Sequence, residues 1–216
     1  MTIKTRNKRI KKDIRKAAHG EDGINKFITL CIQSDCKNIL DIGAGKDLRH
    51  ASTMRTKGLK PTTIDFFENA TIMGDYNKIE FEKQFDGIHA AHVLEHQPNP
   101  NMFLKKIYKD LKEEGWLCIT VPPMKQQIVG GHVSLWNAGL ILYHLILAGF
   151  DCSTAKILEY GYNISIVVQK ISIKKQLNLV YDSPDMDEIR PYLPETLQFD
   201  KRTKRSFDGN IKRLNW

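Results

Sequence analysis

KNILDIGAGKD, residues 37–47, decides the fold class of this chain. Its first part, 37–42, is a short apolar strand that runs into a turn, where Gly43 and Gly45 allow the backbone to bend sharply and a ligand to approach it closely. Apolar residues then recur at helical spacing, and Asp47 is the expected N-cap of this helix. A strand, a glycine-rich turn and a helix open a βαβ unit, so the stretch predicts a parallel sheet.

The same alternation of strands and helices continues along the chain. Asn99 and Pro100 are expected to begin one helix and Gly115 to end it, while Gly149 is expected to end the last helix. Strands are expected at 37–42, 61–67, 70–73, 85–93, 116–121, 151–160 and 163–173, and helices at 24–32, 48–57, 100–114 and 134–148. The pattern predicts an α/β, Rossmann-like fold with helices on both faces of a mostly parallel seven-stranded sheet that ends in a C-terminal antiparallel hairpin.

Charge and composition divide the chain into three parts. Residues 1–16 carry a net charge of +7 and residues 200–216 carry +4, which leaves −3 for the rest of a chain whose total is +8. We therefore expect a basic N-terminal arm over 1–23, a globular domain over 24–173 and a C-terminal extension over 174–216 that packs on the domain or trails from it. The basic ends indicate either an anionic partner, such as nucleic acid, acidic lipid or a phosphorylated substrate, or simply solvated termini.

Several classes of protein are excluded by the same data. No apolar segment reaches the roughly eighteen residues that a membrane span needs, and no apolar segment of a secretion signal follows the basic start. The four cysteines form no C-x-x-C pair and are too few for a disulfide scaffold. The sequence therefore predicts a cytoplasmic protein.

Acidic residues at two strand ends suggest the ligand of the glycine-rich turn. Asp65 ends the second strand 20 residues after Gly45, a spacing that suits a carboxylate bound to ribose hydroxyls. A dinucleotide fingerprint would need a third glycine where Leu48 stands, and Asp41 would repel a pyrophosphate but attract an ammonium group. A ligand with a ribose and a cationic amino-acid end fits better, and S-adenosylmethionine is such a ligand.

Four segments in order resemble the motifs of one family. NILDIGAG resembles its motif I, TIDFF the acidic end of its second strand, MGDY its adenine-side motif, and the stretch from FDGIHAAHVLEHQPNP to WLCITVPP its fourth and fifth strands. Over residues 37–170 the chain thus resembles class I S-adenosylmethionine-dependent methyltransferases, of the group that acts on small molecules and glycans.

The resemblance implies roles for eight cofactor-binding residues. They are Asp41, Gly43 and Gly45 for the methionine moiety, Asp65 for the ribose hydroxyls, Phe66 against the adenine, Asp75 and Tyr76 at the adenine edge, and His92 near the sulfonium and the substrate entrance. Many members of the family have glycine where this chain has Asp47. A carboxylate there either caps the helix or weakens cofactor binding.

Two histidines are candidates for the catalytic base. His132 lies in GGHVSLW, residues 130–136, in the loop after the fifth strand, where an imidazole can take a proton from an acceptor; His92 is the second candidate. HVLEH, residues 92–96, also matches a zinc-protease signature that requires both histidines on one helical face. The stretch leaves a strand and runs into Pro98, so a continuous helix is not expected and no metal is predicted.

These observations predict an enzyme that moves a methyl group from S-adenosylmethionine to a hydroxyl, or another nucleophile, of a sugar, a surface-polysaccharide precursor or a similar small molecule. An RNA methyltransferase that uses its basic termini is one alternative, although the Asn/Asp-Pro-Pro-aromatic motif of nucleic-acid amino-methyltransferases is missing after the fourth strand. A second alternative is an inactive protein that keeps the fold and binds a partner.

Overall fold

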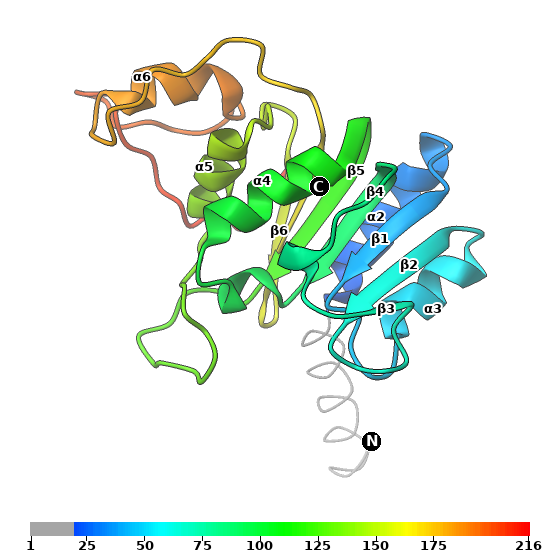
Figure 1. Cartoon of the computed structure of the whole chain (residues 1–216). Coiled ribbons are helices and arrows are strands. Elements are labelled where there is room, and N and C mark those ends of the chain that lie inside the picture. The colour runs from blue at the N-terminus through cyan, green and yellow to red at the C-terminus, as the bar shows by residue number, and fades with distance from the viewer. Residues whose placement is uncertain (1–19) are drawn as a thin grey trace, which may run out of the picture.

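An eight-stranded mixed sheet forms the centre of residues 20–216, the part of the chain that the computed structural model describes (Figure 1). The strand order is β3-β2-β1-β4-β5-β7-β6-β8. The strands are β1 (Asn38–Ile42), β2 (Lys60–Asp65), β3 (Ile72–Met73), β4 (Phe85–Ala91), β5 (Leu111–Val121), β6 (Lys156–Tyr160), β7 (Asn163–Gln169) and β8 (Arg213–Leu214). The predicted basic arm falls almost entirely on residues 1–19, outside the described residues.

The sheet has a parallel and an antiparallel part. β3, β2, β1, β4 and β5 are parallel neighbours, and β7, β6 and β8 continue the sheet in antiparallel pairs. The predicted Rossmann-like fold with a C-terminal hairpin is confirmed. The extension supplies β8, an eighth strand that pairs with β6 and that the sequence pattern does not predict, because two residues carry no readable alternation.

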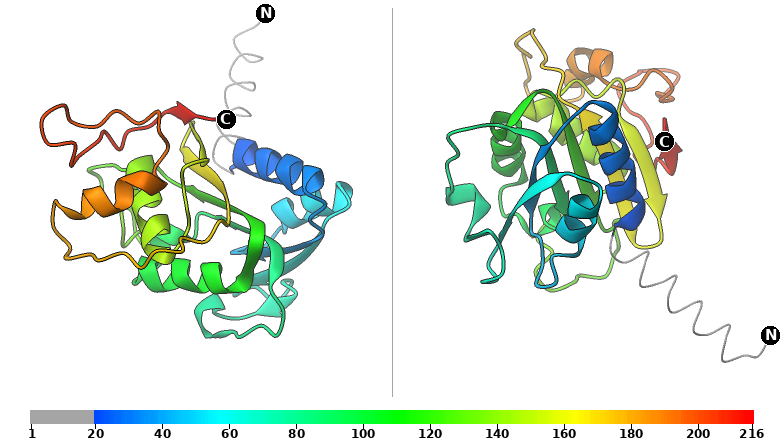
Figure 2. Two further views of the ribbon diagram at one scale, coloured as in Figure 1. Left: turned by 90° about the horizontal axis from the view of Figure 1, so that it is seen from above. Right: turned by 90° about the vertical axis from the view of Figure 1, so that its right-hand side faces the viewer.

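Helices cover both faces of the sheet (Figure 2). α2 (Glu21–Gln33) and α3 (Arg49–Thr56) bury Phe27 and Met54 in one apolar cluster against the sheet. α4 (Pro100–Asp110) and α5 (Ala138–Ala148) pack in a second, larger cluster. The remaining short helices are η1 (Tyr76–Lys78), η2 (Leu94–His96), α6 (Asp185–Ile189) and η3 (Arg190–Tyr192). Among the described helices, none is long and apolar enough to cross a membrane.

Helix ends follow the sequence signals in part. The Asn99 side chain accepts a hydrogen bond from the backbone N–H of Met102 at 3.2 Å and begins α4 as predicted, and Gly149 ends α5 in the left-handed region at φ 111°. α5 begins after Asn137 rather than at Ser134, because the Asn137 side chain accepts from the backbone N–H of Leu140 at 2.8 Å.

Two expected helix boundaries are wrong. Asp47 does not cap α3: Leu48 holds the cap position with φ 48°, and no side chain bonds to the free N–H groups there. α4 ends at Asp110 rather than near Gly115, because β5 already begins at Leu111. The buried ammonium of Lys170 donates to the carbonyls of Tyr108 and Leu111, each at 2.7 Å, and so satisfies the end of the helix.

The C-terminal extension packs on the domain. Met186, Ile189, Leu193 and Leu214 are buried in the same apolar cluster as α4 and α5. Figure 1 shows α6 beside α5, on the side of the molecule away from β2 and β3.

Candidate active site

The turn after β1 is tied to the end of β2 by backbone hydrogen bonds. The N–H groups of Gly43 and Ala44 donate to the carbonyl of Ile64, at 2.9 and 3.3 Å. The N–H of Gly45 donates to Oδ2 of Asp65 at 2.8 Å. Because ligands of open parallel sheets bind beyond the carboxyl ends of the strands, these contacts shape the edge where a ligand is expected.

A cleft of about 80 Å³ opens at this edge, between β1, β2 and β4. Five of the eight predicted cofactor residues line it: Gly43, Asp65, Phe66, Asp75 and Tyr76. Asn77, Val93, Gln97 and Phe103 also line it, and the sequence analysis did not single them out. Asp41, Gly45 and His92 are not among the lining residues.

Asp65 is held in place by its own loop. Its Oδ1 accepts from the N–H of Phe66 at 2.7 Å and from that of Phe67 at 3.3 Å, while Oδ2 accepts from Gly45. A carboxylate oxygen has two lone pairs, so Oδ2 can still accept a hydrogen bond from a ligand hydroxyl.

The two aromatic residues predicted at the adenine differ in exposure. The Phe66 side chain is 76% exposed beside the cleft and is free to stack on a flat ring. Tyr76 is buried, packs edge-to-face on Phe103 and donates its hydroxyl to Oδ2 of Asp110 at 2.8 Å. Burial, with the nearby Asp110, raises the pKa of the Tyr76 phenol, so this residue contributes a wall rather than a polar contact.

Asp75 and its neighbours form a polar rim on the same side. Oδ1 of Asp75 accepts from the N–H of Asn77 at 3.0 Å and from its side-chain amide at 3.1 Å. The same amide donates to Oε1 of Gln97 at 3.0 Å. These contacts connect the adenine-side motif to the segment after β4.

Asp41 faces the interior of the protein. Its carboxylate is 1% exposed, and Oδ1 lies 2.7 Å from Nδ1 of His89, which is itself fully buried. The side chain therefore does not reach the cleft, which the turn borders through Gly43.

Gly43 is in close contact with the loop after β4. A Cβ atom at this position would lie 2.3 Å from Cγ2 of Val93, and the residue has φ 69°. Only glycine fits there without displacing the loop, so the turn and the segment 92–97 are packed as one unit.

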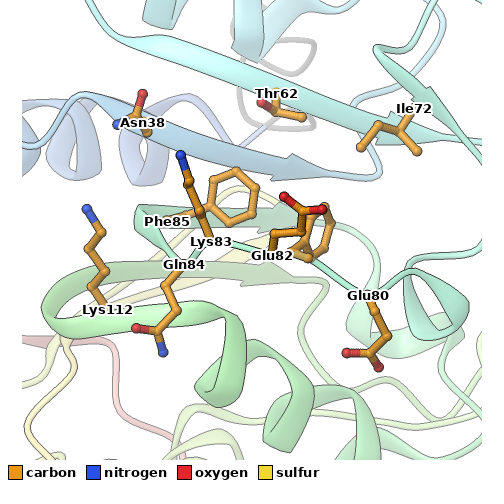
Figure 3. A pocket seen from close by; sticks show the side chains of 10 residues that line it. Asn38, Thr62, Ile72, Glu80, Glu82, Lys83, Gln84, Phe85 and Lys112 are labelled. Carbon is orange, nitrogen blue, oxygen red and sulfur yellow. The ribbon is translucent and has the colours of Figure 1, made fainter.

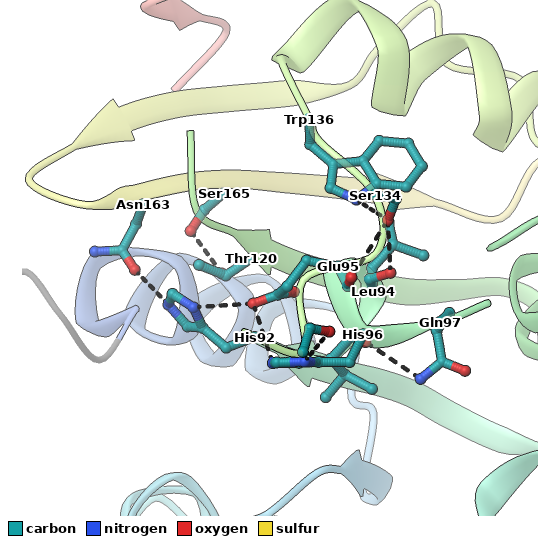
Figure 4. A network of polar contacts seen from close by, with 12 residues as sticks. His92, Leu94, Glu95, His96, Gln97, Thr120, Ser134, Trp136, Asn163 and Ser165 are labelled. Atoms are coloured by element: carbon teal, nitrogen blue, oxygen red, sulfur yellow. Dashed lines mark hydrogen bonds and ion pairs between the residues drawn. The ribbon is translucent and has the colours of Figure 1, made fainter. Parts of the chain in front are cut away.

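His92, the residue after β4, belongs to a network of polar contacts near the carboxyl ends of β4 and β5 (Figure 4). Its Nε2 donates to Oδ1 of Asn163 at 2.9 Å, and its Nδ1 lies 3.3 Å from Oε1 of Glu95. Burial alone would lower the pKa of His92, but the contacts with Glu95 and Asn163 raise it above its ordinary value. Glu95 is fully buried, and the sequence marks it only as part of the HVLEH match.

His132 joins the same network from the loop after β5. Its ring stacks edge-to-face on His96 with centroids 4.9 Å apart. The loop is fixed because the N–H of Val133 donates to the carbonyl of Glu95 at 2.9 Å. The structure thus brings both predicted catalytic histidines close to Glu95: Nδ1 of His92 lies 3.3 Å from its Oε1, and one ligand atom of His132 lies within 4.8 Å of one of Glu95.

A larger hollow, of about 870 Å³, lies at the opposite edge of the sheet (Figure 3). It is lined by Asn38 and Phe85, at the amino ends of β1 and β4, and by Lys112 near the start of β5. None of the predicted site residues lines it. The smaller cleft, where the motif residues meet, is therefore the candidate active site.

The fold and the cleft define the class of protein: a class I S-adenosylmethionine-dependent methyltransferase fold, with the motif residues at the carboxyl edge of the sheet. Residues 5–139 match a family model described as a methyltransferase domain. The match spans more than half of the chain, which therefore belongs to this family. Comparison with curated proteins by sequence gives no match.

Solved structures show the same fold. A SAM-dependent methyltransferase from Aquifex aeolicus has a TM-score of 0.57 at 16% identity, over 79% of this chain and 100% of that one. The 1,6-didemethyltoxoflavin-N1-methyltransferase of Burkholderia thailandensis, solved with its substrate and S-adenosylhomocysteine, has a TM-score of 0.54 at 15% identity, over 69% and 79%. At such identities the likeness establishes the fold.

Proposed function

We propose that this protein is an enzyme that transfers the methyl group of S-adenosylmethionine to a hydroxyl group of a sugar, a surface-polysaccharide precursor or a similar small molecule. The observation that carries the cofactor half of the proposal is Asp65, whose carboxylate is fixed by Gly45 at the end of β2, beside the exposed ring of Phe66. A hydroxyl-binding carboxylate next to a free aromatic face suits the ribose and adenine of a nucleoside.

The chemistry of the other residues around the cleft suits the same cofactor. The tight turn at Gly43 lets a ligand approach the backbone, and Asp75, Asn77 and Gln97 offer polar atoms on the adenine side. The cleft volume of about 80 Å³ is below the roughly 300–1,000 Å³ of small-molecule sites. Binding of the whole cofactor therefore requires the cleft to widen.

The acceptor is proposed to bind under the loop 122–137, which follows β5. The loop carries exposed apolar side chains, at Met124, Ile128, Val129, Val133 and Leu135. Such side chains can cover a bound acceptor and exclude water from it. The bound cofactor supplies an electrophilic methyl group, and the protein's own task is to align the nucleophile and to help it lose its proton. His132 and His92 are the residues that we propose for that help.

A calorimetric titration with S-adenosylhomocysteine, with NAD as the control ligand, tests the cofactor half. We expect micromolar binding of the first ligand and none of the second. Binding of NAD alone would refute the proposal. A screen for transfer of labelled methyl to nucleotide-linked sugars, with an RNA oligonucleotide as the competing acceptor, tests the other half. Methylation of the RNA alone would mean that the acceptor is a nucleic acid and not a sugar.

A further inference from the structure

The buried carboxylate of Glu95 lies among three histidines without a hydrogen bond to either oxygen. The side chain is fully buried, and neither Oε1 nor Oε2 has a hydrogen-bond partner among the described residues. Oε1 lies 3.3 Å from Nδ1 of His92 and 3.9 Å from Nε2 of His96. A buried carboxylate is costly without a positive charge beside it, which a protonated histidine or a bound metal ion supplies.

The tautomer of His96 turns a lone pair toward this carboxylate. Its Nδ1 lies 2.8 Å from the carbonyl oxygen of Gly131, and because a carbonyl only accepts, Nδ1 carries the proton. In the neutral ring, Nε2 then has a free lone pair that faces Oε1 of Glu95. A metal ion, like a proton, can lie between two such atoms, and a metal-binding histidine usually donates its other ring N–H to a backbone carbonyl or a carboxylate, as His96 does to Gly131.

His132 completes a set of three ligands. One ligand atom from each of Glu95, His96 and His132 lies within 4.8 Å of the others. Ligand atoms around tetrahedral zinc are about 3.3 Å apart, given zinc–nitrogen and zinc–oxygen distances of about 2.0–2.1 Å. Small changes in the side-chain torsions of His96 and His132 bring the ligand atoms to this spacing.

We propose that Glu95, His96 and His132 bind one divalent transition-metal ion, with zinc as the best fit. Two imidazoles and one carboxylate suit zinc and its first-row neighbours, whereas Mg²⁺ and Ca²⁺ prefer oxygen ligands alone. Three protein ligands leave a fourth position open, as in catalytic rather than structural zinc sites. The metal was not predicted from HVLEH because that motif requires a helix, but here Glu95 and His96 come from η2 and the third ligand comes from the loop after β5.

The site lies beside the cofactor cleft. Val93 and Gln97, which flank the metal-binding segment, both line that cleft. If the open position takes an acceptor hydroxyl, the ion lowers the pKa of that hydroxyl, so His132 acts through the metal rather than as a free base. This role of the ion rests on the proposed function, but its binding does not.

A second group in the chain serves as an internal control. Asp41, His50 and His89 also place ligand atoms within 4.8 Å of one another. Asp41 Oδ2 and His89 Nε2 also have no hydrogen-bond partner among the described residues, but Asp41 and His89 already pair at 2.7 Å and both are closed off from solvent, whereas His96 in the first group is exposed. We therefore expect no metal at this group.

The test is a titration of untagged, EDTA-stripped full-length protein with Co²⁺, read by its visible absorption, with Zn²⁺ as the competitor. We expect one Co²⁺ per chain, displaced by Zn²⁺ and not by excess Mg²⁺. Glu95→Gln and His132→Ala should each weaken Co²⁺ binding by about tenfold or more. Loss of a hydrogen-bond partner that orients a metal ligand already weakens metal binding by about that factor, and loss of the ligand itself costs at least as much. His132 is in an exposed loop, so its variant is expected to fold.

The control variant His50→Ala should bind Co²⁺ like the wild type. The proposal is wrong if Co²⁺ does not bind stoichiometrically, if His50→Ala removes binding while Glu95→Gln keeps it, or if Mg²⁺ displaces Co²⁺. If Co²⁺ does not bind, the positive charge beside Glu95 comes from a proton on His92 and not from a metal ion. Titration of the same samples with S-adenosylhomocysteine separates this outcome from failure of the proposed function, because cofactor binding does not need the ion.

Discussion

Gly45 and Asp65 join the ends of two neighbouring strands through a single hydrogen bond of 2.8 Å, from the backbone N–H of Gly45 to Oδ2 of Asp65. The bond connects the glycine turn after β1 with the acidic end of β2, so the conformation of the turn and the position of the carboxylate depend on each other. A ligand that binds Asp65 also stabilises the turn, and disruption of either residue is expected to affect both.

Asp65→Ala is therefore predicted to weaken binding of S-adenosylhomocysteine by about tenfold or more, since a hydrogen bond to a charged group contributes about 1.5–3 kcal/mol. Calorimetric titration measures the effect. The matched control is Asp47→Ala, an exposed carboxylate in the same loop that caps no helix. Its removal should leave the affinity unchanged or raise it. Equal losses in both variants would mean that the loop's charge, and not Asp65, binds the ligand.

Phe66→Ala is predicted to weaken the same binding by about fivefold, because a stacked aromatic pair contributes about 0.5–1.5 kcal/mol. The melting temperature should not change, since the side chain is 76% exposed and supports no core contact. Phe67→Ala is the natural control, because Phe67 is the adjacent aromatic residue and does not line the cleft. If the Phe67 variant loses affinity and the Phe66 variant does not, the adenine lies on the other side of the loop.

Motif order and hydrophobic pattern were enough to predict the sheet, the turn after β1 and five residues of the cleft. They were not enough to predict where Asp41 points. Asp41 on β1 and His89 on β4 are direct partners in the parallel register, so their side chains lie on the same face and pair inside the protein. The sequence singles out Asp41 but not its partner, because which strands are neighbours is a property of the folded sheet.

The network around Glu95 was missed for a related reason. Its members come from the segment after β4, from the loop after β5 and, through Asn163, from the start of β7. No sequence window includes all three, and Glu95 itself looks like one more charged residue beside a proline-rich turn. The short match HVLEH contains His92, Glu95 and His96, but its signature requires a helical geometry that the chain does not adopt, and it does not include His132.

Asp86 gives a pH-dependent prediction for stability. It accepts hydrogen bonds from the N–H groups of Lys37 and Asn38, at 2.9 and 2.7 Å, and from the ammonium of Lys112 at 2.6 Å. Partial burial opposes the effect, but these donors hold the pKa of Asp86 below its usual value. The stabilisation is therefore complete above the unfolded-state pKa, near 4, and is lost as the pH falls through the lower pKa of the folded state.

Asp86→Asn should accordingly lower the free energy of unfolding by about 1–2 kcal/mol at pH 7. The gap to the wild type should remain constant down to about pH 5 and narrow below pH 4. Urea denaturation at a series of pH values measures it. The exposed Glu82 supplies the control, since Glu82→Gln should show no gap at any pH. A gap for Asp86→Asn that does not depend on pH would mean that packing, not charge, is responsible.

The contact between α5 and the C-terminal extension is predicted to be part of the folded domain rather than a loose attachment. Gly139 in α5 donates its N–H to the carbonyl of Gly209 at 3.0 Å, and a Cβ atom on Gly139 would lie 2.5 Å from Cα of Gly209 and 2.9 Å from the ring of Phe207. The backbone of Gly209 cannot move aside as a flexible side chain can. Gly139→Ala should therefore lower the free energy of unfolding by about 1–3 kcal/mol and the melting temperature by several degrees, even though alanine favours helices.

Gly130→Ala, where a Cβ atom would meet nothing within 4 Å, should melt like the wild type. If Gly139→Ala is as stable as the control, residues 207–209 do not pack on α5 in solution, and the extension trails from the domain.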